Sequence, residues 1–360
     1  MSKLLAPYNK NGFSLKNHLV MAPMTRSRAI DNIPNDLMAE YYAQRKGAGL
    51  IITEGTSPAP EGLGYPRIPG IFLDEQVSGW KKITDAVHQN NTKIFVQFMH
   101  TGRIAHVDNL PAGSEVVGVS DLKANGQIFT DKSGMQDHSQ PKALTTEEIK
   151  ALVLSHVKAA ENAVKAGFDG IELHGANGYL IEQFLNPNVN NRTDEYGGSL
   201  ESRSSFVIEI AEKMADAIGK EKVGIRFSPF SNMGDLADYD PNEVHQTYTY
   251  LAERLNQIGI AYIHLGVSPK IPRETLDAIR TNFNGTIIIC NGLTPESAEQ
   301  MLVEESFDLV AFGRSFLANP DLDKRIETKA NLSEVDFSTA YTPGAKGYTD
   351  YPFLSENIIA

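Results

Sequence analysis

Cysteine and long hydrophobic runs are almost absent from this sequence. Only one of the 360 residues, Cys290, is a cysteine, which excludes an internal disulfide, a zinc cluster and an iron–sulfur cluster. So little cysteine is typical of a protein from a reducing compartment. No window approaches 18 uninterrupted apolar residues, so we expect no membrane-spanning helix.

Recognisable targeting signals are missing as well. The first 20 residues lack the continuous apolar core of a signal peptide. The last six residues, SENIIA, match neither a peroxisomal nor a retention signal. Together with the single cysteine, these absences predict a cytoplasmic protein.

The chain has fewer positively charged than negatively charged residues. The chain has 33 Lys and Arg residues against 45 Asp and Glu residues, and its formal net charge is −12. Nucleic acids and anionic membrane surfaces bind clustered Lys and Arg, so neither is an expected partner, although a local basic pocket for a phosphate stays possible. Hydrophobic residues make up 41% and charged residues 22%, which excludes a disordered or fibrous chain.

Eight short apolar runs are present, separated by longer amphipathic segments. They are rich in β-branched and aromatic residues, as strands buried on both faces of a parallel sheet are. The runs occupy residues 18–25, 49–56, 93–100, 168–175, 223–229, 262–268, 286–292 and 307–315. Helix signals lie between them: Thr145 and Glu148 form a capping pattern, and Pro295 suits a first helical turn.

This alternation of strand and helix predicts the fold. Eight repeats are typical of a (β/α)₈ barrel, the TIM barrel. An open, doubly wound sheet is the main alternative, but no GxGxxG follows the first strand. We therefore expect residues 1–360 to form a single barrel domain. Residues 101–144, which are rich in Gly, Asp and Ser, are expected to form an inserted loop or small hairpin lid after the third strand.

Polar side chains gather where these strands end. The carboxyl ends of the strands form the active-site face of such a barrel. Glycines after the last two strands, with Arg314, are typical of a phosphate site, although Arg314 could instead form a structural ion pair. Arg226, within the fifth strand, needs either an anionic ligand or a partner such as Glu54 or Glu172, and the residues leave both possibilities open.

The stretch ELHGANGYL, residues 172–180, concentrates this chemistry. It brings an imidazole, a carboxamide and a phenol (His174, Asn177 and Tyr179) to the end of one strand and separates them with small residues. Taken singly, each residue type is more often part of a hydrogen-bonded core. Taken together at the active-site face of a barrel, they predict a catalytic group.

Eight motifs, in order along nearly the whole chain, carry a resemblance to a known family. They are MAPMTRSRA, AEYYAQRKGAGLIITEGT, VQFMHTGR, GFDGIELHGANGYL, QFLNPNVNNRTDEYGGSLESR, GIRFSP, AFGRSFLANPDL and GYTDYP. As a set they resemble the Old Yellow Enzyme family of FMN-dependent ene-reductases. The resemblance implies hydride transfer from NADPH or NADH, through tightly but non-covalently bound FMN, to the activated C=C bond of electron-poor alkenes by a ping-pong cycle.

The resemblance also implies an FMN site. In it the Thr25 hydroxyl meets the flavin O4, Gln97 meets the pyrimidine edge, and Arg226 stabilises the reduced, anionic flavin. Gly55 lies against the ring, and the loops after the last two strands hold the phosphate and its tail. The ten implied cofactor residues are Pro23, Met24, Thr25, Gly55, Gln97, Arg226, Asn291, Gly292, Gly313 and Arg314.

The implied catalytic residues are the three from the ELHGANGYL stretch. His174 and Asn177 bind the carbonyl or nitro oxygen of the substrate, and Tyr179 donates the proton. The implied substrate pocket contains Tyr65, Met99, His174, Asn177 and Tyr341. Asn177 replaces the second histidine of some members, Thr25 replaces a cysteine of one subgroup, and Met99 replaces a tryptophan of many relatives.

Two other functions remain as alternatives. A phosphate-sugar lyase or isomerase could use the same barrel, but it would need a catalytic lysine at a strand end, and the eight runs supply none. A non-catalytic flavin-binding protein would have no use for Tyr179. The spacing of His100, His106 and His138 fits no metal template, so no metal is expected. NADPH and NADH both stay open as reductant, and so do a monomer and a dimer.

Overall fold

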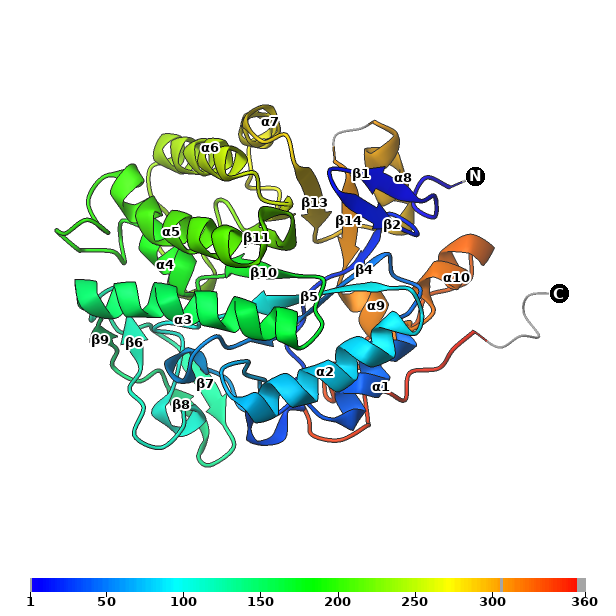
Figure 1. Ribbon diagram of the computed structural model, residues 1–360, viewed down its shortest axis with the longest axis horizontal. Helices are drawn as coiled ribbons and strands as arrows, with labels where there is room; N and C mark the ends of the chain where they lie inside the picture. Colours follow the sequence, from blue (N-terminus) through cyan, green and yellow to red (C-terminus); the bar gives the residue numbers. More distant parts are fainter. Residues whose placement is uncertain (1, 305–306, 355–360) are drawn as a thin grey trace.

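Eight parallel strands form a closed barrel in the computed structural model, which describes residues 2–304 and 307–354. The strand order around the barrel is β10-β11-β12-β13-β14-β3-β4-β5, and helices surround it (Figure 1). The strands are β3 (Leu19–Met21), β4 (Leu50–Thr56), β5 (Lys93–Phe98), β10 (Gly170–Gly175), β11 (Val223–Phe227), β12 (Tyr262–Gly266), β13 (Thr286–Cys290) and β14 (Leu309–Phe312). Each lies inside one of the eight predicted runs, so the predicted barrel is confirmed. The SENIIA segment lies outside the described residues.

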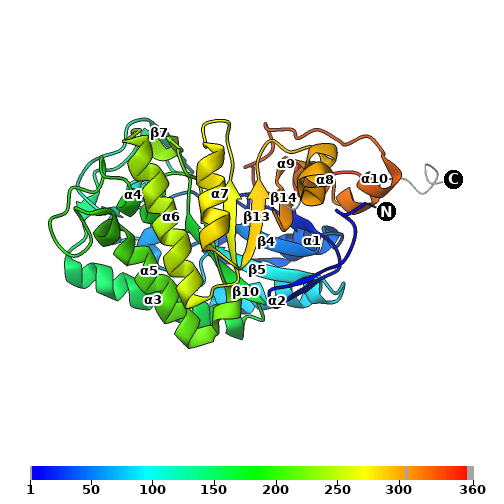
Figure 2. The same ribbon diagram turned by 90° about the horizontal axis from the view of Figure 1, so that it is seen from above.

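Each barrel strand is followed along the chain by at least one helix, and Figure 2 shows the helices around the barrel from a second side. They are α1 (Asp36–Gln44), α2 (Asp74–His88), α3 (Thr146–Lys165), α4 (Leu180–Leu185), α5 (Leu200–Ile218), α6 (Pro241–Ile258), α7 (Arg273–Asn282), α8 (Pro295–Val303), α9 (Arg314–Ala318) and α10 (Leu322–Thr328). Single 3₁₀ turns are η1 (Ile30–Asn32), η2 (Pro60–Gly62), η3 (Val107–Asn109), η4 (Lys220–Lys222) and η5 (Met233–Asp235).

Local sequence sets where these helices begin and end. The Thr145 hydroxyl accepts a hydrogen bond from the Glu148 N–H, and the Glu148 carboxylate accepts one from the Thr145 N–H, as the capping pattern predicts. Helix α6 ends at Gly259, which has a left-handed φ of 80°. Within the part of the chain that the structure describes, no helix is long and apolar enough to cross a membrane.

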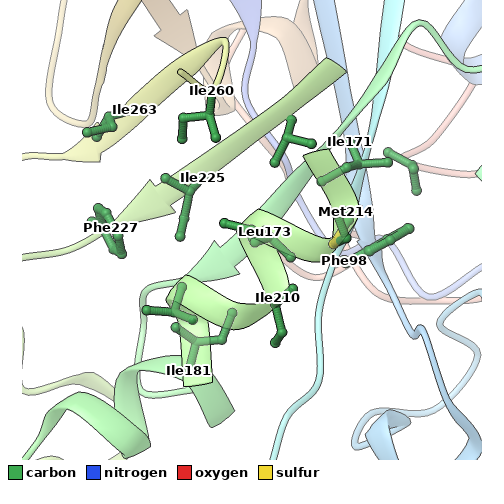
Figure 3. Close-up of a cluster of buried hydrophobic side chains, with 14 of the residues drawn as sticks. Phe98, Ile171, Leu173, Ile181, Ile210, Met214, Ile225, Phe227, Ile260 and Ile263 are labelled. Atoms are coloured by element: carbon green, nitrogen blue, oxygen red, sulfur yellow. The ribbon is translucent and has the colours of Figure 1, made fainter. Parts of the chain in front are cut away.

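The main core lies between the strands and the helices. Alternate strand residues, among them Leu173 and Ile225, point outward against α5, where Ile210 and Met214 pack (Figure 3). A second apolar cluster lies within the barrel. There Phe13, from the hairpin β1 (Tyr8–Lys10) and β2 (Phe13–Leu15), packs on Phe95 and Tyr262 with ring centroids 6.0 and 6.1 Å apart. Apolar packing outside and at one end leaves the strands' carboxyl ends for polar groups.

The segment 101–144 contains the hairpin that the sequence allowed. Strands β7 (Gln127–Thr130) and β8 (Gly134–Asp137) pair antiparallel, with Phe129 opposite Met135. Strands β6 (Val117–Gly118) and β9 (Lys142–Ala143) form a short parallel pair. Phe129 and Met135 are about half exposed, although both also line a cavity described below, so this hairpin carries apolar surface toward the strand ends.

Candidate active site

Two adjoining cavities open at the carboxyl ends of the strands. The larger, of about 860 Å³, is called the central cavity. Its lining includes Pro23, Thr25, Tyr65, Gln97, Met99, His174, Asn177, Tyr179, Arg226 and Tyr341. The smaller, of about 530 Å³, is called the side cavity. Its lining includes Pro23, Met24, Arg226, Asn291, Gly292, Gly313 and Arg314. Pro23 and Arg226 line both, so the two cavities are neighbours.

Of the residues that the resemblance implied, only Gly55 lines neither cavity. It lies on β4, and a β-carbon added to it would stand 2.5 Å from the Met99 sulfur. Its α-carbon therefore faces Met99, which is buried and packs in one cluster with Tyr65 and Tyr179. The structure brings all the others to the cavity walls, and the contact of Gly55 with the flavin ring stays a prediction.

His174 is fixed as a hydrogen-bond donor. It lies at the end of β10, and its Nδ1 accepts a hydrogen bond from the Ala176 N–H at 3.3 Å. Burial, with the nearby Arg226 and His264, lowers the pKa of His174 well below its ordinary value. The ring is therefore neutral near pH 7, and because Nδ1 accepts, the proton sits on Nε2.

Tyr179 is held against two aromatic neighbours. Its hydroxyl donates to the Tyr65 hydroxyl at 3.1 Å, and its ring meets the His174 ring edge-on, with centroids 4.9 Å apart. Burial, with help from Tyr65, raises the pKa of Tyr179 well above 10. The phenol therefore keeps its proton at all ordinary pH values and can donate it to a stronger base that forms beside it.

A buried carboxylate sets the orientation of Gln97. The Gln97 Nε2 donates to Glu172 Oε1 at 2.8 Å, and Glu172 Oε2 lies 2.8 Å from His264 Nδ1. Glu172 and His264 are fully buried. Burial alone would lower the pKa of His264, but the Glu172 carboxylate outweighs it and the pKa rises. Because the amide nitrogen of Gln97 is hydrogen-bonded to Glu172, the amide oxygen is the free acceptor.

Arg226 has no acidic partner in the described part of the chain. Its side chain is 6% exposed, and its Nε has no hydrogen bond. Glu172 instead contacts Gln97 and His264, while Glu54 accepts from the Arg26 N–H and the Tyr42 hydroxyl. The ion pairs considered for Arg226 from sequence are therefore not formed. A buried guanidinium without a partner is costly, and an anion in the adjoining cavities would relieve that cost.

Backbone and glycine form much of the side cavity. Asn291 and Gly292 both have left-handed backbones, with φ of 87° and 66°. A β-carbon at Gly292 would meet no atom within 4 Å, so the space beside it is open. Arg314 has no acidic group within ion-pair distance among the described residues. Open backbone beside an unpaired arginine suits an anionic group.

Several wall residues could not be singled out from the sequence. Arg67, Phe129, Met135 and His138 line the central cavity, together with a segment near the end of the chain, 337–343. Only Tyr341 in that segment was predicted, through the resemblance. Phe129 and Met135 lie on the hairpin strands β7 and β8, and the others lie in loops. None follows a barrel strand directly, and the lid assignment of 101–144 was the one sequence signal, which covered Phe129, Met135 and His138.

Two arginines after β3 hold that distant wall in place. Arg26 donates to the carbonyls of Ala340 and Gly347 at 3.2 and 2.5 Å, and Arg28 donates to Thr339 O at 2.8 Å. Both guanidinium groups also lie over the Tyr348 ring. Arg26 thus supports the cavity wall and does not line either cavity.

Comparison with known proteins identifies the family. Residues 3–333 match the NADH:flavin oxidoreductase / NADH oxidase family. The chain belongs to this family. It is 42% identical to 12-oxophytodienoate reductase 1 of Oryza sativa subsp. japonica, over 98% of this chain and 93% of that protein. It is 38% identical to flavin oxidoreductase hxnT of Emericella nidulans, over 98% of both.

A solved structure agrees over the whole fold. Morphinone reductase in complex with tetrahydroNAD superposes with a TM-score of 0.94 at 40% identity, covering 99% of both chains. These findings confirm the resemblance to the Old Yellow Enzyme family. The protein is accordingly an FMN flavoprotein and an NAD(P)H-dependent oxidoreductase.

Proposed function

We propose that the protein is an ene-reductase, which reduces the C=C bond of α,β-unsaturated carbonyl, imide or nitro compounds. Electrons come from NADPH or NADH by way of FMN, and coenzyme and alkene enter the same central cavity in turn. The observation that carries this proposal is the convergence of His174, Asn177 and Tyr179 on the cavity that Gln97 and Arg226 also line.

The residues present fit FMN. The Gln97 oxygen is a free acceptor for a ring N–H, and the unpartnered Arg226 offers a positive charge where the reduced ring would be anionic. Thr25 and Met24 continue the wall, and the side cavity suits a phosphate. Gly55, masked by Met99, would reach the ring only if the Met99 side chain moved, so we assign Met99 rather than Gly55 to that wall.

The side chains then divide the chemistry. When bound, FMN supplies a carrier that accepts hydride from the coenzyme and delivers it to the β-carbon. The His174 Nε2–H and the Asn177 amide donate to the substrate oxygen, where negative charge develops, and so stabilise the transition state more than the ground state. Tyr179 donates its proton to the α-carbon as a general acid.

The alternatives lose support at this site. No lysine lines the central cavity within the residues that the structure describes, and the family is one of oxidoreductases, which argues against a lyase or isomerase. A protonated Tyr179 beside a neutral His174 donor argues against a non-catalytic flavin carrier. The name of the neighbour solved with tetrahydroNAD supports a nicotinamide coenzyme in this cavity.

We also infer that residues 1–360 act as one barrel domain in which segment 101–144 is a lid. The hairpin residues Phe129 and Met135 on the cavity wall support this role. A cytoplasmic location remains a prediction from the single cysteine. The proposed partners are small electron-poor alkenes.

An anaerobic absorbance experiment tests the function. The purified protein is mixed with NADPH or NADH, and then with cyclohexenone. We expect flavin absorbance that is bleached by a coenzyme and restored by the enone. The matched control is cyclohexanone, which has the same oxygen but no C=C bond, and which should restore nothing.

Each outcome has a distinct meaning. Absorbance that is bleached but not restored by the enone would contradict the ene-reductase proposal while keeping the flavoprotein. If cyclohexanone also restores the flavin absorbance, the group that reoxidises the flavin is not the C=C bond. Comparing the bleaching rates of the two coenzymes gives the preference that the residues leave open.

A further inference from the structure

The turn that carries Asn177 has an unusual backbone. Asn177 and Gly178 are consecutive left-handed residues, with φ of 60° and 79°. Residues with a β-carbon rarely adopt that conformation, so surrounding contacts must hold it. The turn separates His174 from Tyr179, and its shape therefore decides where the carboxamide and the phenol lie relative to the imidazole.

The two N–H groups of the turn are hydrogen-bonded to one buried carboxylate, one of them directly and the other through a serine hydroxyl. The Gly178 N–H donates directly to Glu182 Oε2 at 2.6 Å. The Asn177 N–H donates a hydrogen bond to Ser228 Oγ at 2.9 Å. The Ser228 hydroxyl in turn donates a hydrogen bond to Glu182 Oε1, also at 2.9 Å, so Ser228 links Asn177 to Glu182. Glu182 lies on α4, directly after the catalytic stretch, whereas Ser228 follows β11.

The opposite side of the turn is also confined. A β-carbon at Gly178 would stand 2.2 Å from the Met233 carbonyl oxygen, so the loop after β11 packs directly on the turn. The Gly178 carbonyl accepts from Gln183 Nε2 at 2.8 Å. The turn is therefore held from both faces and has little freedom to adjust if one contact is lost.

The position of Glu182 suits a group that can accept hydrogen bonds on both of its terminal atoms. Both of its oxygens accept from donors, and a further donor, the Tyr248 hydroxyl, lies 3.3 Å from Oε1. An amide of the same size has only one acceptor oxygen, so it would lose one of the two hydrogen bonds that the oxygens of Glu182 accept. Glu182 is 4% exposed and has no basic partner among the described residues, so burial opposes its charged form.

We propose that Glu182, with Ser228, is a positioning residue for the reaction: it fixes the Asn177–Gly178 turn and thereby the donor to the substrate oxygen and the reach of Tyr179. Glu182 lines neither the central nor the side cavity, so it acts through the turn and does not touch the substrate. This inference rests on the proposed ene-reductase function.

The test compares Glu182→Gln with the wild-type flavoprotein in rapid-mixing experiments. The reduced enzyme is reoxidised by cyclohexenone in one series and by dioxygen in the other. We expect the enone reaction to slow roughly 10- to 100-fold, as small misplacements of reacting groups do. Reoxidation by dioxygen, which needs neither Asn177 nor Tyr179, should stay within about twofold, and the FMN dissociation constant should not change.

Two further variants locate the effect. Ser228→Ala removes only the link between Asn177 and Glu182. We therefore expect mainly weaker binding of cyclohexanone, measured as a perturbation of the flavin spectrum. The loss of the maximal rate with the enone should be smaller. Tyr248→Phe removes the longest contact of Glu182 and leaves the turn untouched, so it should behave like the wild type. Ser228→Ala also tests the inference on its own if Glu182→Gln does not fold.

The outcomes separate this inference from the function on which it rests. A wild-type enzyme that the enone does not reoxidise contradicts the function before any variant is measured. A wild-type enzyme that works, with Glu182→Gln and Ser228→Ala matching Tyr248→Phe, overturns the positioning role. Equal slowing with enone and dioxygen would also overturn it, because that result indicates general damage to the flavin site.

Discussion

The central and side cavities adjoin at Arg226 but are built differently. The central cavity presents side chains whose orientation is fixed from behind, as Glu172 fixes Gln97 and Glu182 fixes the turn at Asn177. The side cavity presents left-handed backbone and glycine, with Arg314 as its unpaired charge. The difference indicates that buried supporting residues orient the side chains of the central cavity, whereas backbone conformation shapes the side cavity.

The two supporting glutamates differ in turn. Glu172 Oε2 lies 2.8 Å from His264 Nδ1, and this carboxylate raises the pKa of His264. Glu182 is surrounded by neutral donors only, and burial raises its pKa to about 7. The same residue type thus has a histidine partner behind Gln97 and only neutral hydrogen-bond donors at the Asn177–Gly178 turn.

The largest expected effect comes from removing Tyr179, the proposed proton donor of the central cavity. Tyr179→Phe should slow reoxidation by cyclohexenone by about 10²- to 10⁴-fold, the usual contribution of general acid catalysis. Flavin reduction by the coenzyme and reoxidation by dioxygen should be close to wild type, since neither needs the phenol. A loss of less than about tenfold in the enone reaction would assign the proton to another donor.

The second effect is a pH dependence of stability that belongs to Glu182. The folded-state pKa of about 7 lies above the ordinary value of 4.5, so the folded protein holds this proton more tightly than the unfolded chain. The group therefore stabilises the fold at low pH, and this contribution, of about 3 kcal/mol, is lost as the pH rises from the ordinary value to the folded one.

Urea unfolding across that pH range measures this contribution. The free energy of unfolding of the wild type should fall with rising pH more steeply than that of Glu182→Gln. Burial also raises the pKa of Glu54 to about 7, but that residue is common to both proteins and cancels in the difference. Parallel pH profiles for the two proteins would contradict the assigned pKa.

A substitution of Arg226 probes the place where the two cavities meet. Arg226→Met should weaken FMN binding by about 10- to 100-fold, the value of a charge-assisted hydrogen bond, as measured by flavin fluorescence. The same change should stabilise the apoprotein, because it removes a buried guanidinium whose Nε has no partner. Arg226→Lys, which keeps the charge, is the control. Unchanged FMN affinity in the methionine variant would separate this residue from the cofactor.

The smallest effect concerns the backbone of the side cavity. Gly292→Ala should destabilise the protein by about 1 kcal/mol, because φ is left-handed there while the space around the new methyl group is open. Gly313→Ala is the matched control, since Gly313 has an ordinary φ of −90°. Urea unfolding of both variants checks the contrast, and an equal loss at the two positions would assign the cost to packing.

The sequence predicted the strands well because strands buried on both faces are continuous apolar runs. Strand ends in turn predicted which residues reach the cavities, from Thr25 to Arg314. Orientation could not be predicted in this way. Which atom Gln97 offers depends on Glu172, which lies 75 residues away, and the contact of Gly55 with Met99 depends on a side-chain conformation.

Supporting residues were harder still to predict. Glu182 follows the stretch 172–180 by two residues, yet its proposed role depends on hydrogen bonds with Gly178 and with Ser228, which follows β11. Arg26 directly follows the first predicted run, 18–25, but its side chain donates hydrogen bonds to carbonyls more than 300 residues later. Such contacts join segments that share no local pattern, so neither hydrophobic periodicity nor motif spacing contains them.

The pairing of β14 with β3 has a consequence for how the protein is made. These are the first and last strands of the barrel along the chain, so the ring stays an open sheet until residues 309–312 have left the ribosome. The wall near Tyr341 follows later still. The nascent chain thus exposes strand edges for most of its synthesis and can bind flavin only at the end. We therefore expect it to need protection by chaperones early in its biogenesis and the cofactor late.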